Sequence, residues 1–286
     1  MNNSPEFHQL AAAGIRGGAR LAAGFETARV EPVDARPIPA FNRAGQPRRR
    51  AQPNPEFPPS AKETMDTDTM DFDALDTRDV PLVPDHAALL FIDVQNFSCR
   101  REGGEFKGLS EPELQERFGW FLDHIARESL PNMAKLQACC RASKVEVIYT
   151  VIENLTLDGR DRSLDYRITG FNVPKGSWDA QVLSEIAPQG DEMVFPKTSS
   201  NVFVSTHLDY VLRNMGKRQI VVSGFITDQC VSSAVRSACD LGYLVTVVTD
   251  GCASYSLERH TRALTEMKGY CRQVTTDALC AELDPT

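Results

Sequence analysis

The sequence lacks an uncharged apolar run of about 18 residues, so it predicts no membrane-spanning helix. It also lacks the basic segment followed by an apolar stretch that marks a secretory signal. Positive charge is in deficit, since 31 Lys and Arg stand against 39 Asp and Glu, for a net charge of −8. Such a balance argues against a protein that binds nucleic acid. We therefore expect a protein that engages neither nucleic acid nor membrane.

The cysteines show no disulfide pattern. Eight are present, and most lie within apolar segments without the regular spacing of a disulfide framework. This predicts reduced thiols in an intracellular, cytoplasmic protein, with Cys239 and Cys252 in the core.

Charge and proline divide the chain near residue 80. Residues 1–50 carry eight Arg, no Lys and four acidic residues, whereas residues 51–80 carry two basic and eight acidic residues. Nine of the 17 prolines lie in residues 1–80. Such a segment buries too little apolar surface to offset the entropy of ordering, so we interpret residues 1–80 as a disordered extension. An alternative left open is an organelle-targeting helix over residues 11–25, which would place the protein in an organelle.

From residue 81 the pattern is that of a single α/β domain, residues 81–286. Short apolar runs typical of buried strands occupy residues 87–93, 145–152, 192–197, 219–225, 244–249 and 272–274. Helical patterns occupy residues 114–142, with a possible break before Pro131, then 206–215, 229–241 and 256–268, with a last helix opened by Thr276. Strands and helices that alternate in this way predict a three-layer α/β/α sandwich with a mainly parallel, doubly wound sheet of six strands.

Three reactive side chains follow strands of this predicted sheet. Asp93 ends the first strand, Lys197 ends the third, and Cys230 comes just after the fourth, at the start of a helix. Ligand sites of doubly wound sheets lie beyond the carboxyl ends of the strands. A helix start and a nearby ammonium both favour a thiolate, and a carboxylate can accept the thiol proton. Each residue alone is compatible with a structural role, but the three together indicate a catalytic site.

The motifs around these residues, FIDVQN, PKTSSNVF and SGFITDQCV, resemble those of the isochorismatase-like cysteine hydrolases over about residues 80–284. The resemblance implies an Asp93–Lys197–Cys230 triad that needs no cofactor and cleaves a small-molecule amide through a thioester. It also implies a cis peptide bond between Phe225 and Ile226, with an oxyanion hole formed by the backbone N–H groups of Ile226 and Cys230. Family members commonly form dimers or tetramers, so we expect a homo-oligomer.

The substrate class is narrowed by what is missing after the second predicted strand. Nicotinamidases of this family carry an Asp-x-His pair there, but residues 153–162 hold no histidine, and the five histidines of the chain form no close ligand pair. We therefore expect no metal. The segment VPKGSWDAQ and the motif FIDVQN look more like the ureidoacrylate group, which favours a ureido or carbamoyl substrate. Two alternatives stay open, namely an isochorismatase that cleaves an enol ether and an inactive scaffold that binds a ligand or a partner.

Several polar residues near the predicted strand ends are candidates for substrate binding, each with a structural alternative. Gln95 and Asn96 bond substrate or brace their loop, and Phe97 lines the pocket or packs in the core. Arg160 pairs with a substrate carboxylate or remains a solvated side chain. The other candidates are Glu153, Asn154 and Ser199.

Overall fold

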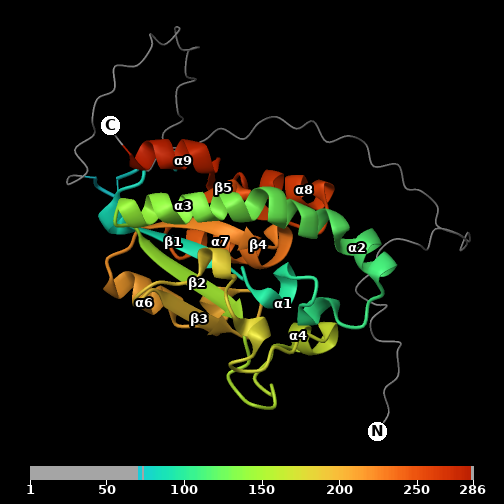
Figure 1. Cartoon of the computed structure of the whole chain (residues 1–286). Coiled ribbons are helices and arrows are strands. Elements are labelled where there is room, and N and C mark those ends of the chain that lie inside the picture. Colours follow the sequence, from blue (N-terminus) through green and yellow to red (C-terminus); the bar gives the residue numbers. More distant parts are fainter. Residues whose placement is uncertain (1–69, 73, 285–286) are drawn as a thin grey trace, which may run out of the picture. The chain divides into compact units, whose positions relative to one another are not determined.

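A six-stranded sheet forms the centre of the described part of the chain, residues 70–72 and 74–284 of a computed structural model (Figure 1). Its strands are β1 (Ala87–Ile92), β2 (Glu146–Ile152), β3 (Met193–Lys197), β4 (Gln219–Phe225), β5 (Leu244–Ala253) and β6 (Arg272–Val274). Their order is β3-β2-β1-β4-β5-β6, and every neighbouring pair is parallel. The predicted α/β class and doubly wound sheet are therefore confirmed.

Helices cover both faces of the sheet. They are α1 (Asn96–Cys99), α2 (Glu111–His124), α3 (Leu130–Ala142), α4 (Leu164–Thr169), α5 (Val202–Ser205), α6 (Leu208–Asn214), α7 (Ser232–Asp240), α8 (Leu257–Met267) and α9 (Thr276–Leu283). Side chains of β1 alternate between the faces: Leu89 and Phe91 pack with α2, α3 and α9, whereas Leu90 and Ile92 pack with α6, α7 and α8. Both faces of the central strand are thus buried, as its continuous apolar sequence predicts.

The predicted helix over residues 114–142 does not break at Pro131. Helices α2 and α3 are joined by a π-helical turn, Ile125–Ser129, in which the N–H of Leu130 donates to the carbonyl of Ile125. Pro131 lies in the first turn of α3, where a missing N–H costs little. The wider turn therefore lets the chain continue in one direction past the proline.

Segments before β1 also contribute to the core. Val80, Leu82 and Val83 are buried. Most of the predicted extension, residues 1–69 and 73, lies outside the described residues, so the division of the chain at residue 80 stays a prediction, as does the targeting helix over residues 11–25. Within the residues that are described, no helix is both long and apolar enough to cross a membrane.

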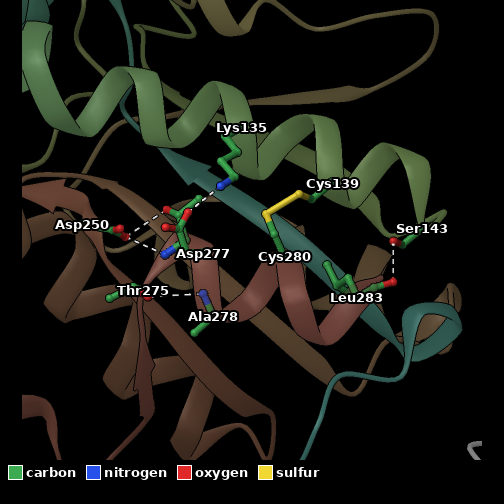
Figure 2. Close-up of a disulfide and its surroundings, with 10 residues drawn as sticks. Lys135, Cys139, Ser143, Asp250, Thr275, Asp277, Ala278, Cys280 and Leu283 are labelled. Atoms are coloured by element: carbon green, nitrogen blue, oxygen red, sulfur yellow. Dashed lines mark hydrogen bonds and ion pairs between the residues drawn. A yellow bond between two sulfur atoms is a disulfide. The ribbon is translucent and has the colours of Figure 1, made fainter. Parts of the chain in front are cut away.

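A disulfide joins Cys139 of α3 to Cys280 of α9, across 141 residues of sequence (Figure 2). The prediction that the cysteines are reduced is therefore wrong for this pair, which removes cysteine usage as an argument for a cytoplasmic location. Two further contacts link the same helices: the Lys135 ammonium lies 2.5 Å from an Asp277 carboxylate oxygen, and the Ser143 hydroxyl donates to the carbonyl of Leu283. Sequence spacing could not reveal the pair, because only the fold brings α9 against α3.

Loss of this disulfide is expected to destabilise the domain without removing the active-site residues. A Cys139→Ser variant should lose about 2–4 kcal/mol of unfolding free energy, because the unfolded chain gains conformational entropy. Urea unfolding with and without a thiol reductant measures the effect. Reductant should destabilise the original chain but not Cys139→Ser, and the control Cys239→Ser should behave as the original chain does. If the original chain is equally stable with and without reductant, the prediction is contradicted.

Candidate active site

Asp93, Lys197 and Cys230 meet at the carboxyl ends of β1, β3 and β4. The Lys197 Nζ atom lies 2.8 Å from the Asp93 Oδ2 atom and 3.4 Å from the Cys230 Sγ atom. All three residues are buried, with exposed fractions of 2% for Asp93, 0% for Lys197 and 6% for Cys230. The structure thus brings together the carboxylate, ammonium and thiol that the strand ends predicted.

The backbone turns sharply at Asp93, where β1 ends. Its φ of 54° lies in the left-handed region, which aspartate adopts more readily than most residues. Thr150 of β2 fixes both ends of the residue, since its carbonyl accepts the Asp93 N–H and its hydroxyl donates to Oδ1 at 3.0 Å. The carboxylate is therefore held toward Lys197 by the neighbouring strand.

The strands that carry Asp93 and Cys230 approach each other closely through Gly224. A Cβ atom at Gly224 would lie 2.2 Å from the carbonyl oxygen of Ile92, and its φ of 137° is one that other residues rarely adopt. Glycine is needed here because the backbones of β1 and β4 leave no room for a side chain.

The Lys197 ammonium has partners on every side. Besides Asp93 and Cys230, its Nζ atom donates to the Tyr166 hydroxyl and to the carbonyl of Ser199, both at 2.9 Å. Burial opposes the charge, but Asp93 and Cys230 outweigh it and hold the pKa of Lys197 well above its usual value. Lys197 is therefore a permanent cation. Tyr166 was missed by the sequence analysis, because a single tyrosine in a polar segment carries no signal.

Cys230 lies in a π-helical turn, Thr227–Val231, and not in the first turn of an α-helix as predicted. The expectation of a favoured thiolate also needs correction. Burial raises the pKa of Cys230 to about 12; Lys197 opposes this rise, and the Asp93 carboxylate adds to it. The resting site therefore holds a protonated thiol beside an ammonium, so attack on a substrate requires a base for the thiol proton.

The turn that holds Cys230, Thr227–Val231, follows a cis peptide bond between Phe225 and Ile226, at the position that the family resemblance implied. Cys230 lies within this turn, and Ile226 is the residue that directly precedes it. The two N–H groups of the expected oxyanion hole therefore come from one short segment. Its backbone bonds converge on one carbonyl: both Gln229 and Val231 donate to the carbonyl oxygen of Ile226.

Three of the predicted substrate-binding residues brace loops instead. The Gln95 amide donates to the carbonyls of Ile152 and Asp179 and accepts the N–H of Ile152, which uses both of its donors. Asn96 donates to the carbonyl of Trp178. Phe97 is buried, and its ring packs edge-on against Phe171. These contacts favour the structural alternative for all three.

Of the four remaining candidates, two make structural contacts, one is exposed and one reaches the site. Glu153 accepts the N–H of Gly176, and the buried Asn154 side chain donates to Asn172. Arg160 is exposed and pairs with Asp158, so the structure does not bring it to the triad. Ser199 does reach the site, but through its carbonyl oxygen on Lys197 and not through its hydroxyl. Sequence reasoning predicted the convergence of the three strand-end side chains better than the roles of the residues around them.

A buried histidine contacts the turn that holds Cys230. The His260 Nδ1 atom lies 2.8 Å from the Thr227 hydroxyl oxygen. Burial is the main reason that the pKa of His260 falls to about 4, and His124 lowers it further while Asp228 opposes the fall. The ring is therefore neutral in the folded protein at pH 7.

His260 is expected to weaken the folded state in mild acid. Between pH 6.5 and 4 the unfolded chain is protonated at this residue while the folded chain is not, so the free energy of unfolding rises with pH across that window. His260 changes the free energy of unfolding by about 3 kcal/mol over this range. Urea unfolding from pH 4 to 7 should show a shallower slope for His260→Asn than for the original chain. The exposed His207→Asn control should keep the original slope, and identical slopes in all three would contradict the prediction.

No group of three His, Cys, Asp or Glu side chains is arranged to hold a metal ion among the described residues. Metal-independent activity stays a prediction. Dialysis against a strong chelator should leave turnover unchanged; loss of activity that zinc or manganese restores would contradict it.

Known proteins share both the sequence and the architecture of this chain. The isochorismatase domain family matches residues 87–278. The ureidoacrylate amidohydrolase RutB of Rhizobium rhizogenes is 28% identical over 187 residues, which cover 60% of this chain and 72% of that protein. RutB of Agrobacterium fabrum is also 28% identical over 187 residues, which cover 60% of this chain and 77% of that protein.

Solved structures of the same architecture include two enzymes. A cysteine hydrolase from Pseudomonas syringae pv. phaseolicola superposes with a TM-score of 0.61 at 22% identity, covering 71% of this chain and 95% of that one. The N-carbamoylsarcosine amidase from Thermoplasma acidophilum has a TM-score of 0.52 at 24% identity, covering 67% and 96%. These likenesses show the shared fold, and the family match spans more than half of the chain. The chain therefore belongs to the isochorismatase family of hydrolases.

Proposed function

We propose that this chain is a cysteine-dependent amidohydrolase that cleaves the C–N bond of a small ureido or carbamoyl compound. The observation that carries the proposal is the buried contact of the Lys197 ammonium with both the Asp93 carboxylate and the Cys230 thiol. The likeness to ureidoacrylate amidohydrolases supports the substrate class.

The first half-reaction forms a thioester. Asp93 takes the proton of the Cys230 thiol as the sulfur attacks the substrate carbonyl carbon, so that the S–C bond forms and the carbonyl oxygen becomes an oxyanion. The backbone N–H groups of Ile226 and Cys230 stabilise that oxyanion. When the intermediate collapses, the C–N bond breaks, and Asp93 returns the proton to the leaving ammonia or amine.

The second half-reaction releases the acid. Asp93 takes a proton from water, whose oxygen attacks the thioester carbon through a second oxyanion. The C–S bond then breaks, and the sulfur recovers the proton from Asp93. Lys197 stays protonated throughout, because Asp93 and Cys230 hold its pKa well above the usual value, and its charge stabilises the sulfur as negative charge develops there.

A panel of small compounds tests this function. The purified chain should release ammonia from at least one N-substituted urea or N-carbamoyl amino acid, and more slowly or not at all from nicotinamide and simple alkyl amides. Cleavage of isochorismate without ammonia release from any amide would favour enol-ether chemistry. No turnover of any compound would favour a binding scaffold over an enzyme.

A further inference from the structure

The proposed mechanism does not use Glu105, a partly buried residue in the loop between α1 and α2. Glu105 belongs to a short 3-10 turn, Gly104–Phe106, between α1 and α2. One of its carboxylate oxygens accepts a hydrogen bond from the Tyr255 hydroxyl. The other, Oε2, is shielded from solvent and has no hydrogen-bond partner among residues 70–72 and 74–284. A buried carboxylate oxygen without a partner is costly, so it calls for a function.

Tyr255 links this carboxylate, through two intermediate side chains, to residues next to the proposed oxyanion hole. Its ring packs edge-on against Phe121, which in turn packs edge-on against Phe225 at the cis peptide bond. The Arg259 guanidinium lies over the Tyr255 ring, 5.0 Å from its centroid, and pairs with Asp228 of the turn that holds Cys230. Glu105 is thus held by a residue that is one side chain away from Phe225 and one side chain away from Asp228.

Electrostatic effects agree with this placement. Burial is the main cause that raises the pKa of Cys99 to about 12, and the Glu105 and Asp93 carboxylates both add to the rise. Burial likewise raises the pKa of Tyr255 well above its usual value, and Glu105 and Cys230 add to that rise. Cys99 therefore lies within electrostatic range of both Glu105 and Asp93, and Tyr255 within range of both Glu105 and Cys230.

We propose that Glu105 is a specificity-determining residue whose free oxygen accepts the N–H of a substrate's second nitrogen. This inference rests on the proposed function. The leaving nitrogen takes its proton from Asp93, so the group on the other side of the carbonyl carbon is free to meet another residue. In R–NH–CO–NH2 that group is an N–H donor, whereas in R–CH2–CO–NH2 it is a methylene.

The Glu105–Tyr255 pair is suited to accept a hydrogen bond from a substrate N–H. Burial raises the pKa of Glu105 to about 7, while the Tyr255 hydrogen bond lowers it, and an N–H at Oε2 would stabilise the charged form further. A carboxylate on the substrate at this point would instead be repelled. Glu105 therefore selects ureas over plain amides of the same shape, because a buried acceptor left unpaired penalises the analogue that lacks the donor.

The test compares two compounds that differ in a single group, N-ethylurea and butyramide. Both are titrated by NMR into the Cys230→Ala protein, in which neither is consumed. Ethylurea should bind at least about tenfold more tightly than butyramide, the ratio expected for a hydrogen bond to a charged group. In the Cys230→Ala background, Glu105→Gln should weaken the binding of ethylurea alone, so that the two affinities differ by no more than about twofold. Tyr255→Phe should reduce the ratio partly, and Glu102→Gln, an exposed control in the same loop, should leave it unchanged.

Thermal unfolding checks that each variant is folded. The inference is overturned if Glu105→Gln leaves the ratio intact, if it weakens both compounds equally, or if ethylurea does not bind at all. Ammonia release by the original chain is measured separately. If Glu105→Gln changes the binding ratio but the original chain releases no ammonia, the proposed function alone is contradicted. If the original chain releases ammonia but Glu105→Gln leaves the ratio unchanged, this inference alone is contradicted.

Discussion

Replacing Cys230 by alanine is expected to abolish hydrolysis, with turnover falling by at least about 10⁴-fold. Among the described thiols, only Cys230 has a hydrogen bond to the Lys197 ammonium, whereas Cys99 meets Asp93 through the backbone carbonyl of that residue. No other thiol is therefore expected to replace it. The fold should survive, because alanine is tolerated in a helical turn and removes only one sulfur atom. Ammonia release measures the loss, and the thermal melting temperature measures the fold.

Cys239→Ala is the matched control. Cys239 lies on α7, nine residues further along the chain, and is half-buried away from the triad. The control should keep nearly all of the activity. Equal losses in the two variants, or a Cys230→Ala protein that still turns over, would contradict the assignment of the nucleophile.

Replacing Lys197 by methionine is expected to cost both activity and stability. The fully buried ammonium is the counter-ion of Asp93, and removing one partner of a buried pair leaves an uncompensated charge, at about 3–5 kcal/mol. The Cys230 sulfur also loses the cation that would stabilise its developing negative charge, so activity should fall. Urea unfolding and ammonia release measure the two effects.

A second substitution separates charge from packing. Asp93→Asn in the Lys197→Met background removes the unpaired charge, so it should restore much of the lost stability while activity stays absent. If Lys197→Met is as stable as the original chain, the pair is not the buried ion pair described here. If the double variant is less stable than Lys197→Met, packing and not charge explains the loss.

The triad could be predicted because its geometry follows from topology. Parallel strands place their carboxyl ends at one edge of a sheet, so an Asp after β1, a Lys ending β3 and a Cys after β4 converge once the strands are identified. Strand periodicity is a local signal, and β4 and β6 were predicted with the bounds that the structure has. The candidate site is thus the part of the molecule that local pattern and sheet topology determine together.

Other parts depend on which side chain meets which, and no local pattern carries that information. Gln95 comes two residues after Asp93 and looks like a ligand-binding amide, yet both of its N–H groups donate to the carbonyls of Ile152 and Asp179. Tyr166 reaches Lys197 from a helix of six residues in a polar segment. Glu105 meets Tyr255 across 150 positions of sequence. Long-range contacts of this kind require the folded chain.

The disulfide between α3 and α9 has a consequence for proteolysis. The segment after β2 exposes Leu157 to solvent at 92%, which makes it the natural point for a protease to cut. A cut there separates Asp93 from Lys197 and Cys230 in sequence, but Cys139 stays with the first fragment and Cys280 with the second. The nicked protein is therefore a covalent two-chain molecule, and its fragments part only when it is both unfolded and reduced. On a denaturing gel it runs as one species without reductant and as two with it.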